Sequence, residues 1–175
     1  FGTPLFTHLK LEAARIIVSL DAELLGSKGD GLALAKAWAS GRRPETGAMN
    51  RLYVLEPSMS ETGAAADHRF SLRAEHIKAV AAHLDAELSE RLKSGVAGEA
   101  QPRPAAKSLA DAGLRKFLQV LVDDLVANAG ASVVAVGPAQ SPEVHALVHR
   151  INALLGAPGK TLTYSAAPPV RALSD

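Results

Sequence analysis

Arg15-Ile-Ile-Val-Ser-Leu20 is the stretch that decides the fold of this 175-residue chain. It is short, apolar and rich in β-branched residues, and it lacks the polar–apolar alternation of a half-exposed strand. Such a run is typical of a parallel strand that is covered on both faces. Similar runs at Arg51-Leu-Tyr-Val-Leu-Glu56 and Ser132-Val-Val-Ala-Val136 predict two more buried strands. We therefore expect a parallel sheet at the centre of the molecule.

Two helices are predicted in the first half of the chain. Asp30 is placed to cap the first, which Gly41 would end. The residues expected on its buried face are Leu32, Ala35, Trp38 and Ala39. The second helix covers residues 74–93, where apolar residues recur at steps of three and four. Between the two helices, after the strand at 51–56, a turn-rich stretch leads to a short third strand at Arg69-Phe-Ser-Leu72.

Two more helices are predicted in the second half. Ser108 would cap the first, with Asp111 favouring its positive end and Gly130 ending it. Ser141 would cap the second, with Pro142 at its first position. The stripes expected to be buried are Leu114, Phe117, Leu118, Leu121 and Leu125 in the first, and Val144, Leu147, Val148, Ile151 and Leu154 in the second. A last strand is expected at Thr161-Leu-Thr-Tyr164.

Strands that alternate with helices through short turns predict the α/β class: an open, mostly parallel, Rossmann-like sheet with helices on both faces. We interpret residues 1–175 as one such domain from a longer chain, because Phe1 is not an initiator residue. Residues 93–107 mix Gly, Pro and charge without periodicity and predict a flexible loop. Residues 165–175 predict an Ala/Pro-rich tail.

Composition excludes several classes of protein. The net charge is only +1, so the chain is not a polybasic nucleic-acid binder. It contains no Cys, which excludes a disulfide framework, a thiol nucleophile and an Fe–S cluster held by this segment. Residues 125–142 carry no charge, but Gly, Pro and Asn interrupt the run, so we expect no membrane span.

Two local motifs suggest chemistry that their context does not support. Gly156-Ala-Pro-Gly-Lys-Thr161 is similar to the end of a P-loop, but position 154 is Leu and the segment joins a helix to a strand. We expect a helix stop and a turn there. His145 and His149 have a spacing that can place two imidazoles on one metal, but the Glu of HExxH is missing. We expect both to flank the buried stripe as partly exposed side chains.

Acidic residues gather near the predicted strand ends, where ligands bind in open α/β sheets. They are Asp21, Glu23, Glu56, Glu61 and the Asp of Asp67-His68-Arg69. A carboxylate there can accept hydrogen bonds from a ribose or a base. The alternative is that it caps a helix or pairs with Arg. No Ser-His-Asp order or nucleophile elbow is present, so we predict no catalytic residue and no metal ligand.

Four segments of the chain carry a family resemblance. They are Ile16–Gly26, Met49–Ser58, Thr62–Arg73, and Gly137 together with Leu155–Thr161. The pair NRLYVLEP (50–57) and TGAAADHR (62–69) is the most specific part. These segments resemble the molybdopterin oxidoreductase superfamily. More closely, they resemble the large iron–sulfur subunit of bacterial alternative complex III, also known as a Tat-variant-translocated molybdopterin oxidoreductase.

In active members of that superfamily, three turns contact molybdopterin guanine dinucleotide. The matching positions here are Ser19-Leu20-Asp21, Glu56-Pro57-Ser58 and Ala74-Glu75-His76, and all three depart from the family pattern. The resemblance therefore implies a domain without a cofactor that has a structural or docking role. Under the alternative, in which the dinucleotide of a molybdenum or tungsten oxidoreductase is bound, the expected contacts are Ser19, Asp21, Glu56, Ser58, Asp67 and Gly137.

The resemblance also implies a setting. The longer chain would hold Fe–S clusters outside these residues and would belong to a membrane-associated respiratory complex that oxidises quinol and transfers electrons. The expected partners are other domains of that chain and other subunits of the complex, on the periplasmic side. Neither nucleic acid nor a direct membrane span is expected for the segment itself.

Overall fold

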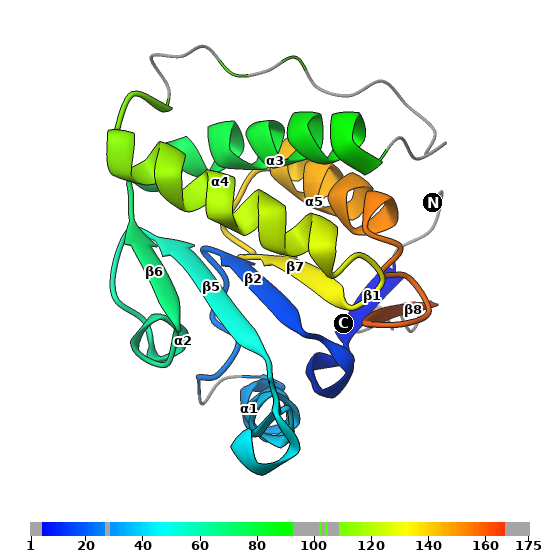
Figure 1. The fold of residues 1–175 in the computed structure, drawn as a ribbon. Coiled ribbons are helices and arrows are strands. Elements are labelled where there is room, and N and C mark those ends of the chain that lie inside the picture. Colours follow the sequence, from blue (N-terminus) through cyan, green and yellow to red (C-terminus); the bar gives the residue numbers. More distant parts are fainter. Residues whose placement is uncertain (1–4, 27–28, 93–101, 103, 105–108, 167–175) are drawn as a thin grey trace, which may run out of the picture.

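The computed structural model describes residues 5–26, 29–92, 102, 104 and 109–166. Its centre is a sheet of four parallel strands (Figure 1). In their order across the sheet they are β6 (His68–Ser71), β5 (Arg51–Glu56), β2 (Ile16–Leu20) and β7 (Ser132–Val136). Counted along the chain this order is 3-2-1-4, as in the first four strands of a Rossmann fold. The predicted open, Rossmann-like parallel sheet is confirmed.

The central strand β2 explains why its sequence is apolar throughout. Val18 lies opposite Tyr53 of β5 on one side and opposite Val134 of β7 on the other. Successive side chains point to opposite faces, and all five residues of β2 are buried. Ile16, Val18 and Leu20 join one hydrophobic core, whereas Ile17 joins a second core on the other face.

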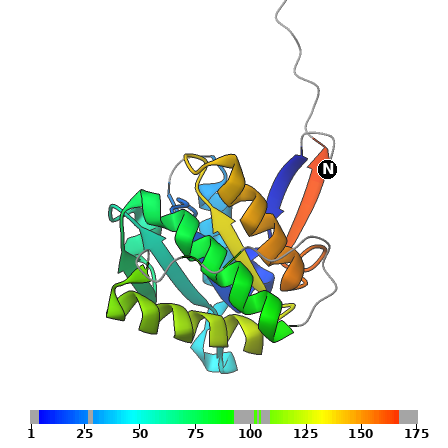
Figure 2. The same ribbon diagram turned by 90° about the horizontal axis from the view of Figure 1, so that it is seen from above.

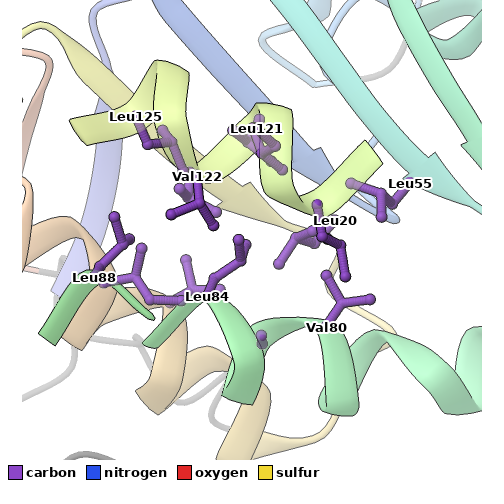
Figure 3. Close-up of a cluster of buried hydrophobic side chains, with 14 of the residues drawn as sticks. Leu20, Leu55, Val80, Leu84, Leu88, Leu121, Val122 and Leu125 are labelled. Atoms are coloured by element: carbon purple, nitrogen blue, oxygen red, sulfur yellow. The ribbon is translucent and has the colours of Figure 1, made fainter. Parts of the chain in front are cut away.

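Helices α3 (Ile77–Leu92), α4 (Ala112–Ala127) and α5 (Pro142–Leu154) cover one face of the sheet (Figures 1 and 2). Figure 3 shows Leu84 and Leu88 of α3 opposite Leu121 and Val122 of α4, close to Leu20 of the sheet. The predicted stripes of α4 and α5 belong to this core, with Phe117 packed against it as a partly buried side chain. The larger of the two cores therefore lies between the sheet and these helices.

Helix α1 (Gly31–Ser40) covers the other face, but its buried face differs from the prediction. Leu34, Ala37 and Trp38 pack against the second core, whereas Leu32 is 82% exposed and Ala39 is also exposed. A Cβ added at Gly31 would lie 1.7 Å from the carbonyl oxygen of Gly26, so the backbone of the first turn abuts the preceding loop and Leu32 points away. Asp30 occupies the N-cap position without a side-chain cap bond.

The predicted start of α4 was wrong. The helix begins at Ala112, and Asp111 is its N-cap, because the Asp111 carboxylate accepts a hydrogen bond of 2.8 Å from the N–H of Leu114. Position 108 lies outside the described residues. The helix ends at Ala127, and Gly130 follows with a φ of 85° in the turn toward β7.

The last strand lies outside the parallel sheet. β8 (Leu162–Ala166) pairs antiparallel with β1 (Leu5–Leu9), a strand that the sequence pattern did not predict. Ser165 and Ala166, predicted as tail, end β8; the rest of that tail and most of the loop predicted at 93–107 lie outside the described residues. The predicted stop and turn between α5 and β8 is confirmed, with a φ of 64° at Gly156 and 81° at Gly159.

Short elements complete the described chain. They are η1 (Leu11–Ala13), β3 (Arg42–Arg43), η2 (Pro44–Thr46), β4 (Ala48–Met49), α2 (Glu61–Ala64) and η3 (Ala74–His76). Helix α2 lies in the stretch predicted only as turns. Within the described residues, no helix combines the length and the apolar character needed to cross a membrane.

Candidate functional site

The carboxyl ends of β2 and β5 enclose a hollow of about 320 Å³. It lies where ligands bind in open α/β sheets. Its lining residues are Asp21, Ala22, Glu23, Glu56, Pro57, Ser58, Met59 and Ser60. Several residues predicted from sequence therefore meet there, and the bonds of each decide what the hollow can bind.

Glu23 accepts hydrogen bonds from the first turn of α2. Its carboxylate accepts from the N–H of Glu61 at 3.2 Å, from the N–H of Thr62 at 3.1 Å and from the Thr62 hydroxyl. The first N–H groups of a helix lack partners within the helix and attract anions. Burial raises the pKa of Glu23, but the hydrogen bonds from Thr62, Leu25 and Glu61 outweigh it and lower the pKa below its usual value. Glu23 is therefore an anion that the chain itself supplies.

Thr62 connects the loop after β2 to α2. Its hydroxyl donates to Glu23 and accepts from the N–H of Leu24 at 2.8 Å and from that of Leu25 at 3.0 Å. The residue is fully buried. The sequence pattern did not identify Thr62, because a four-residue helix shows no periodicity.

Glu56 forms a second internal anion site beside the first. Its side chain is 4% exposed and accepts a hydrogen bond of 2.6 Å from Nε of Arg69. It also accepts from the N–H of Ser60 at 3.2 Å and from its hydroxyl at 2.5 Å. A Cβ added at Gly63 would lie 1.8 Å from Oε1 of Glu56, so only glycine allows this approach. Of the two interpretations of Glu56, pairing with Arg is confirmed.

The turns that follow β2 and β7 are in backbone contact. This is the point where the strand order reverses and where Rossmann folds bind dinucleotides. A Cβ added at Gly137 would lie 1.8 Å from the carbonyl oxygen of Asp21, and Gly137 donates its N–H to Leu20 at 2.9 Å. The Asp21 carboxylate accepts from Gln140 at 2.8 Å, so a side-chain bond joins the same two loops. Asp21 has a φ of 56°, a conformation that Asp tolerates better than most residues.

Two further predicted site residues lie beside these turns and the hollow. Ser19 is buried, and its hydroxyl donates to the carbonyl of Ala22 at 2.7 Å and accepts from the N–H of Ala22 at 3.1 Å. Ser19 therefore holds the turn after β2. Ser58 is exposed in the hollow, next to Met59, which is 69% exposed.

Asp67 does not join this site, and its expected place at the ligand-binding edge was wrong. It directly precedes β6, so it lies at the amino edge of the parallel sheet, opposite the hollow. Its carboxylate accepts from Arg42 at 2.7 and 2.9 Å and from the N–H of Leu52 at 2.8 Å. Burial raises the pKa of Asp67, but the bonds from Arg42 and Leu52 outweigh it and lower the pKa.

The two histidines of α5 line a second cavity of about 480 Å³ between α5, β7, β1 and the loop after β2, and Ala22 and Glu23 border both this cavity and the hollow. Nδ1 of His149 lies 3.1 Å from the hydroxyl of Tyr164. Burial and the neighbouring His145 lower the pKa of His149. No group of three or more acidic or His side chains that could hold a metal gathers in the described part of the chain.

The residues of the carboxyl edge do not fit an anionic dinucleotide. A pyrophosphate needs N–H groups that it can approach closely and a positive charge to balance its own. Here the N–H groups of α2 already bind Glu23, and Arg69 already binds Glu56. An added anion about 4 Å from either carboxylate would meet a repulsion of roughly 1–4 kcal/mol.

The sequence matches no protein-family model and no curated protein.

Proposed function

We propose that this chain is a cofactor-free, molybdopterin-oxidoreductase-like domain with a structural and docking role. It would belong to the iron–sulfur subunit of a membrane-associated electron-transfer complex that oxidises quinol. The observation that carries the proposal is the Glu23 carboxylate, an anion of the chain itself that already binds the N–H groups at the start of α2. The family assignment itself rests on the sequence resemblance.

The backbone contact between the turns after β2 and β7 supports the same proposal. Dinucleotide-binding turns keep glycine after the first strand, so that a pyrophosphate can approach the backbone. In this chain Asp21 occupies that turn, and its backbone packs against Gly137. By the resemblance, Ser58 stands where active members of that superfamily carry an Arg, so the hollow has no charge-assisted donor at that position.

The alternative is a working molybdopterin guanine dinucleotide domain of a molybdenum or tungsten enzyme. It would require Glu23 and Glu56 to leave their present partners, and the freed N–H groups and Arg69 to bind phosphate. Breaking several charge-assisted hydrogen bonds costs about 1.5–3 kcal/mol for each bond. The resemblance to active superfamily members is the observation that keeps this alternative open.

The deciding experiment uses the full-length protein purified with its natural partners. Molybdenum and tungsten are measured by mass spectrometry, and guanine nucleotide is measured after acid extraction. We expect less than a tenth of an equivalent of each per chain. Near-stoichiometric metal together with guanine dinucleotide would overturn the proposal.

A pair of variants tests the structural role in the same preparation. Glu56→Ala removes the buried partner of Arg69, so we expect less assembled complex but an unchanged rate of quinol oxidation per assembled complex. Ser58→Ala changes an exposed residue of the same hollow and should alter neither quantity. A fall in the rate per complex for Glu56→Ala, with assembly intact, would contradict a purely structural role.

A further inference from the structure

The outer edge of β7 carries backbone groups that point away from the parallel sheet. β7 pairs with β2 on one side, and within the described residues no strand pairs with its other side. The N–H of Gly137 bonds to the carbonyl of Leu20, the last residue of β2. Because the direction of these groups alternates along a strand, the N–H and C=O groups of Ser132, Val134 and Val136 point outward.

Side chains already bond to two of these three residues. The Asn152 amide accepts from the N–H of Val134 at 2.9 Å and donates to its carbonyl at 2.8 Å. The Thr161 hydroxyl donates to the carbonyl of Ser132 at 2.7 Å. In the part of the chain that the structure describes, no hydrogen bond reaches the N–H or the C=O of Val136. Val136 therefore presents a donor and an acceptor side by side.

The cavity of about 480 Å³ runs along this edge. Val134, Ala135 and Val136 all line it, although their side chains alternate between the two faces of the sheet. The cavity therefore follows the backbone edge of β7. Strand β1 lies beyond this edge, and α5 lies over it (Figures 1 and 2). The volume is within the range of small-molecule sites, roughly 300–1,000 Å³.

The cavity has an apolar wall on each face of the sheet. Val148 of α5 belongs to the core on the helical face, whereas Leu9 and Leu24 pack with the core on the other face. All three residues line the cavity. The hydrogen bonds of a strand edge lie near the plane of the sheet, so a ligand bonded to Val136 would have these walls above and below it. Such walls fit the two faces of a flat ring.

The charges around the cavity disfavour an anion. The residues that line it include no Lys or Arg. Burial raises the pKa of Glu23, but its hydrogen bonds outweigh this effect and lower the pKa, so an anion borders the cavity. Burial, together with the neighbouring His145, lowers the pKa of His149, so this ring is neutral at pH 7. A neutral ligand is therefore favoured.

We propose that this cavity binds a small, neutral, flat heterocycle that carries a hydrogen-bond acceptor next to a donor on one edge. The acceptor would bond to the N–H of Val136, and the donor to its C=O. Cyclic amides and amino-heterocycles share this pattern of groups. The inference goes beyond the proposed function and does not rest on it, because the site lies at the outer edge of β7 and its ligand carries no phosphate.

The test uses two neutral probes on the full-length protein, 2-quinolone for cyclic amides and adenine for amino-heterocycles. Isothermal titration calorimetry measures binding, and the probe that binds more tightly identifies the class. We expect that probe to bind at one site with a Kd below about 1 mM, as is usual for fragments of this size. Its methylated analogue, 1-methyl-2-quinolone or N6,N6-dimethyladenine, lacks the donor and should bind at least tenfold more weakly. The anion 2-quinolone-4-carboxylate should also bind at least tenfold more weakly than 2-quinolone.

A pair of variants tests the role of the strand edge. Val136→Pro removes the outward N–H without loss of a bond to β2, whereas Val136→Ala keeps it. We expect Val136→Pro to weaken binding of the probe at least tenfold and Val136→Ala to change it less than threefold. Equal binding to the two variants would overturn the proposal.

A crystal structure of the unmodified protein with the probe covers the case in which Val136→Pro does not fold. The ring should lie between Val148 and Leu24, with both hydrogen bonds to Val136. A probe bound elsewhere, equal binding of the methylated analogue, or no saturable binding of either probe would overturn the proposal.

Discussion

The Glu23 carboxylate accepts hydrogen bonds from both the backbone N–H and the hydroxyl of Thr62, a residue 39 positions further along the chain. This pair joins the loop after the central strand to the helix after its neighbour. The anion that accepts hydrogen bonds from the first N–H groups of α2 is therefore a side chain of the protein itself, Glu23. A bound anion would have to compete with a carboxylate that pays no translational entropy to be there.

Thr62→Val is expected to destabilise the fold by about 1–3 kcal/mol. Valine has nearly the same shape, but it leaves the N–H of Leu24 without an acceptor and the N–H of Leu25 with only its bond of 3.3 Å to Glu23. Urea unfolding measures the change as a lower midpoint at an unchanged slope. Thr62→Ser, which keeps the hydroxyl, should lose less than half as much. Equal losses in the two variants would show that the methyl group, not the hydroxyl, is what matters.

The parallel sheet was predictable because burial on both faces leaves a direct mark on the sequence. β2, β5 and β7 each differ from their predicted runs by no more than one residue at an end. β1 was missed because it belongs to a two-stranded sheet and its three central residues are exposed, so its sequence has no continuous apolar run. The start of α4 was misplaced because Ser108 and Asp111 are both good caps, and tertiary packing chooses between them.

The site was predictable as a set of acids at strand ends, but not as a network. Sequence alone left Glu56 free to bind a ligand or an Arg, and only the fold places Arg69 beside it. Asp67 was grouped with the other acids because it lies close to a strand in sequence, but it precedes β6 and therefore lies at the amino edge of the sheet. Gln140 gave no sequence pattern at all, since its partner Asp21 lies 119 residues away.

Asp67→Asn is expected to reduce the pH dependence of stability under acid conditions. The pKa of Asp67 is lower in the folded protein than its ordinary value of 3.8, so the carboxylate stabilises the fold above that pH. This contribution is lost as the pH falls through the lowered pKa. Unfolding free energies of the two proteins should therefore converge between about pH 4 and pH 2 and differ by a constant amount above about pH 5. The control is Asp30→Asn, a carboxylate without a cap bond. A difference that grows as the pH falls would contradict the assignment.

Gly137→Ala is expected to cost more stability than Gly159→Ala. The new Cβ at position 137 would lie 1.8 Å from the Asp21 carbonyl oxygen, so the turns after β2 and β7 must separate. At position 159 the space is open, and the cost is that of a φ of 81°, roughly 1–2 kcal/mol. Thermal unfolding of both variants shows which substitution causes the larger loss of stability. A smaller loss for Gly137→Ala would mean that the two turns separate at little cost.

Asn152→Leu is expected to release the Val134 amide to solvent exchange. The Asn152 side chain imitates a strand by bonding to both backbone groups of Val134, and leucine of similar volume cannot replace either bond. Two buried backbone groups would lose their partners, at a cost of about 1–3 kcal/mol for each unsatisfied group. Hydrogen exchange followed by NMR separates the local effect from a global one. Val133, whose N–H points to β2, serves as the internal control, because its exchange should change only as much as the global stability does. If the Val134 and Val133 amides accelerate equally, Asn152 contributes only through packing.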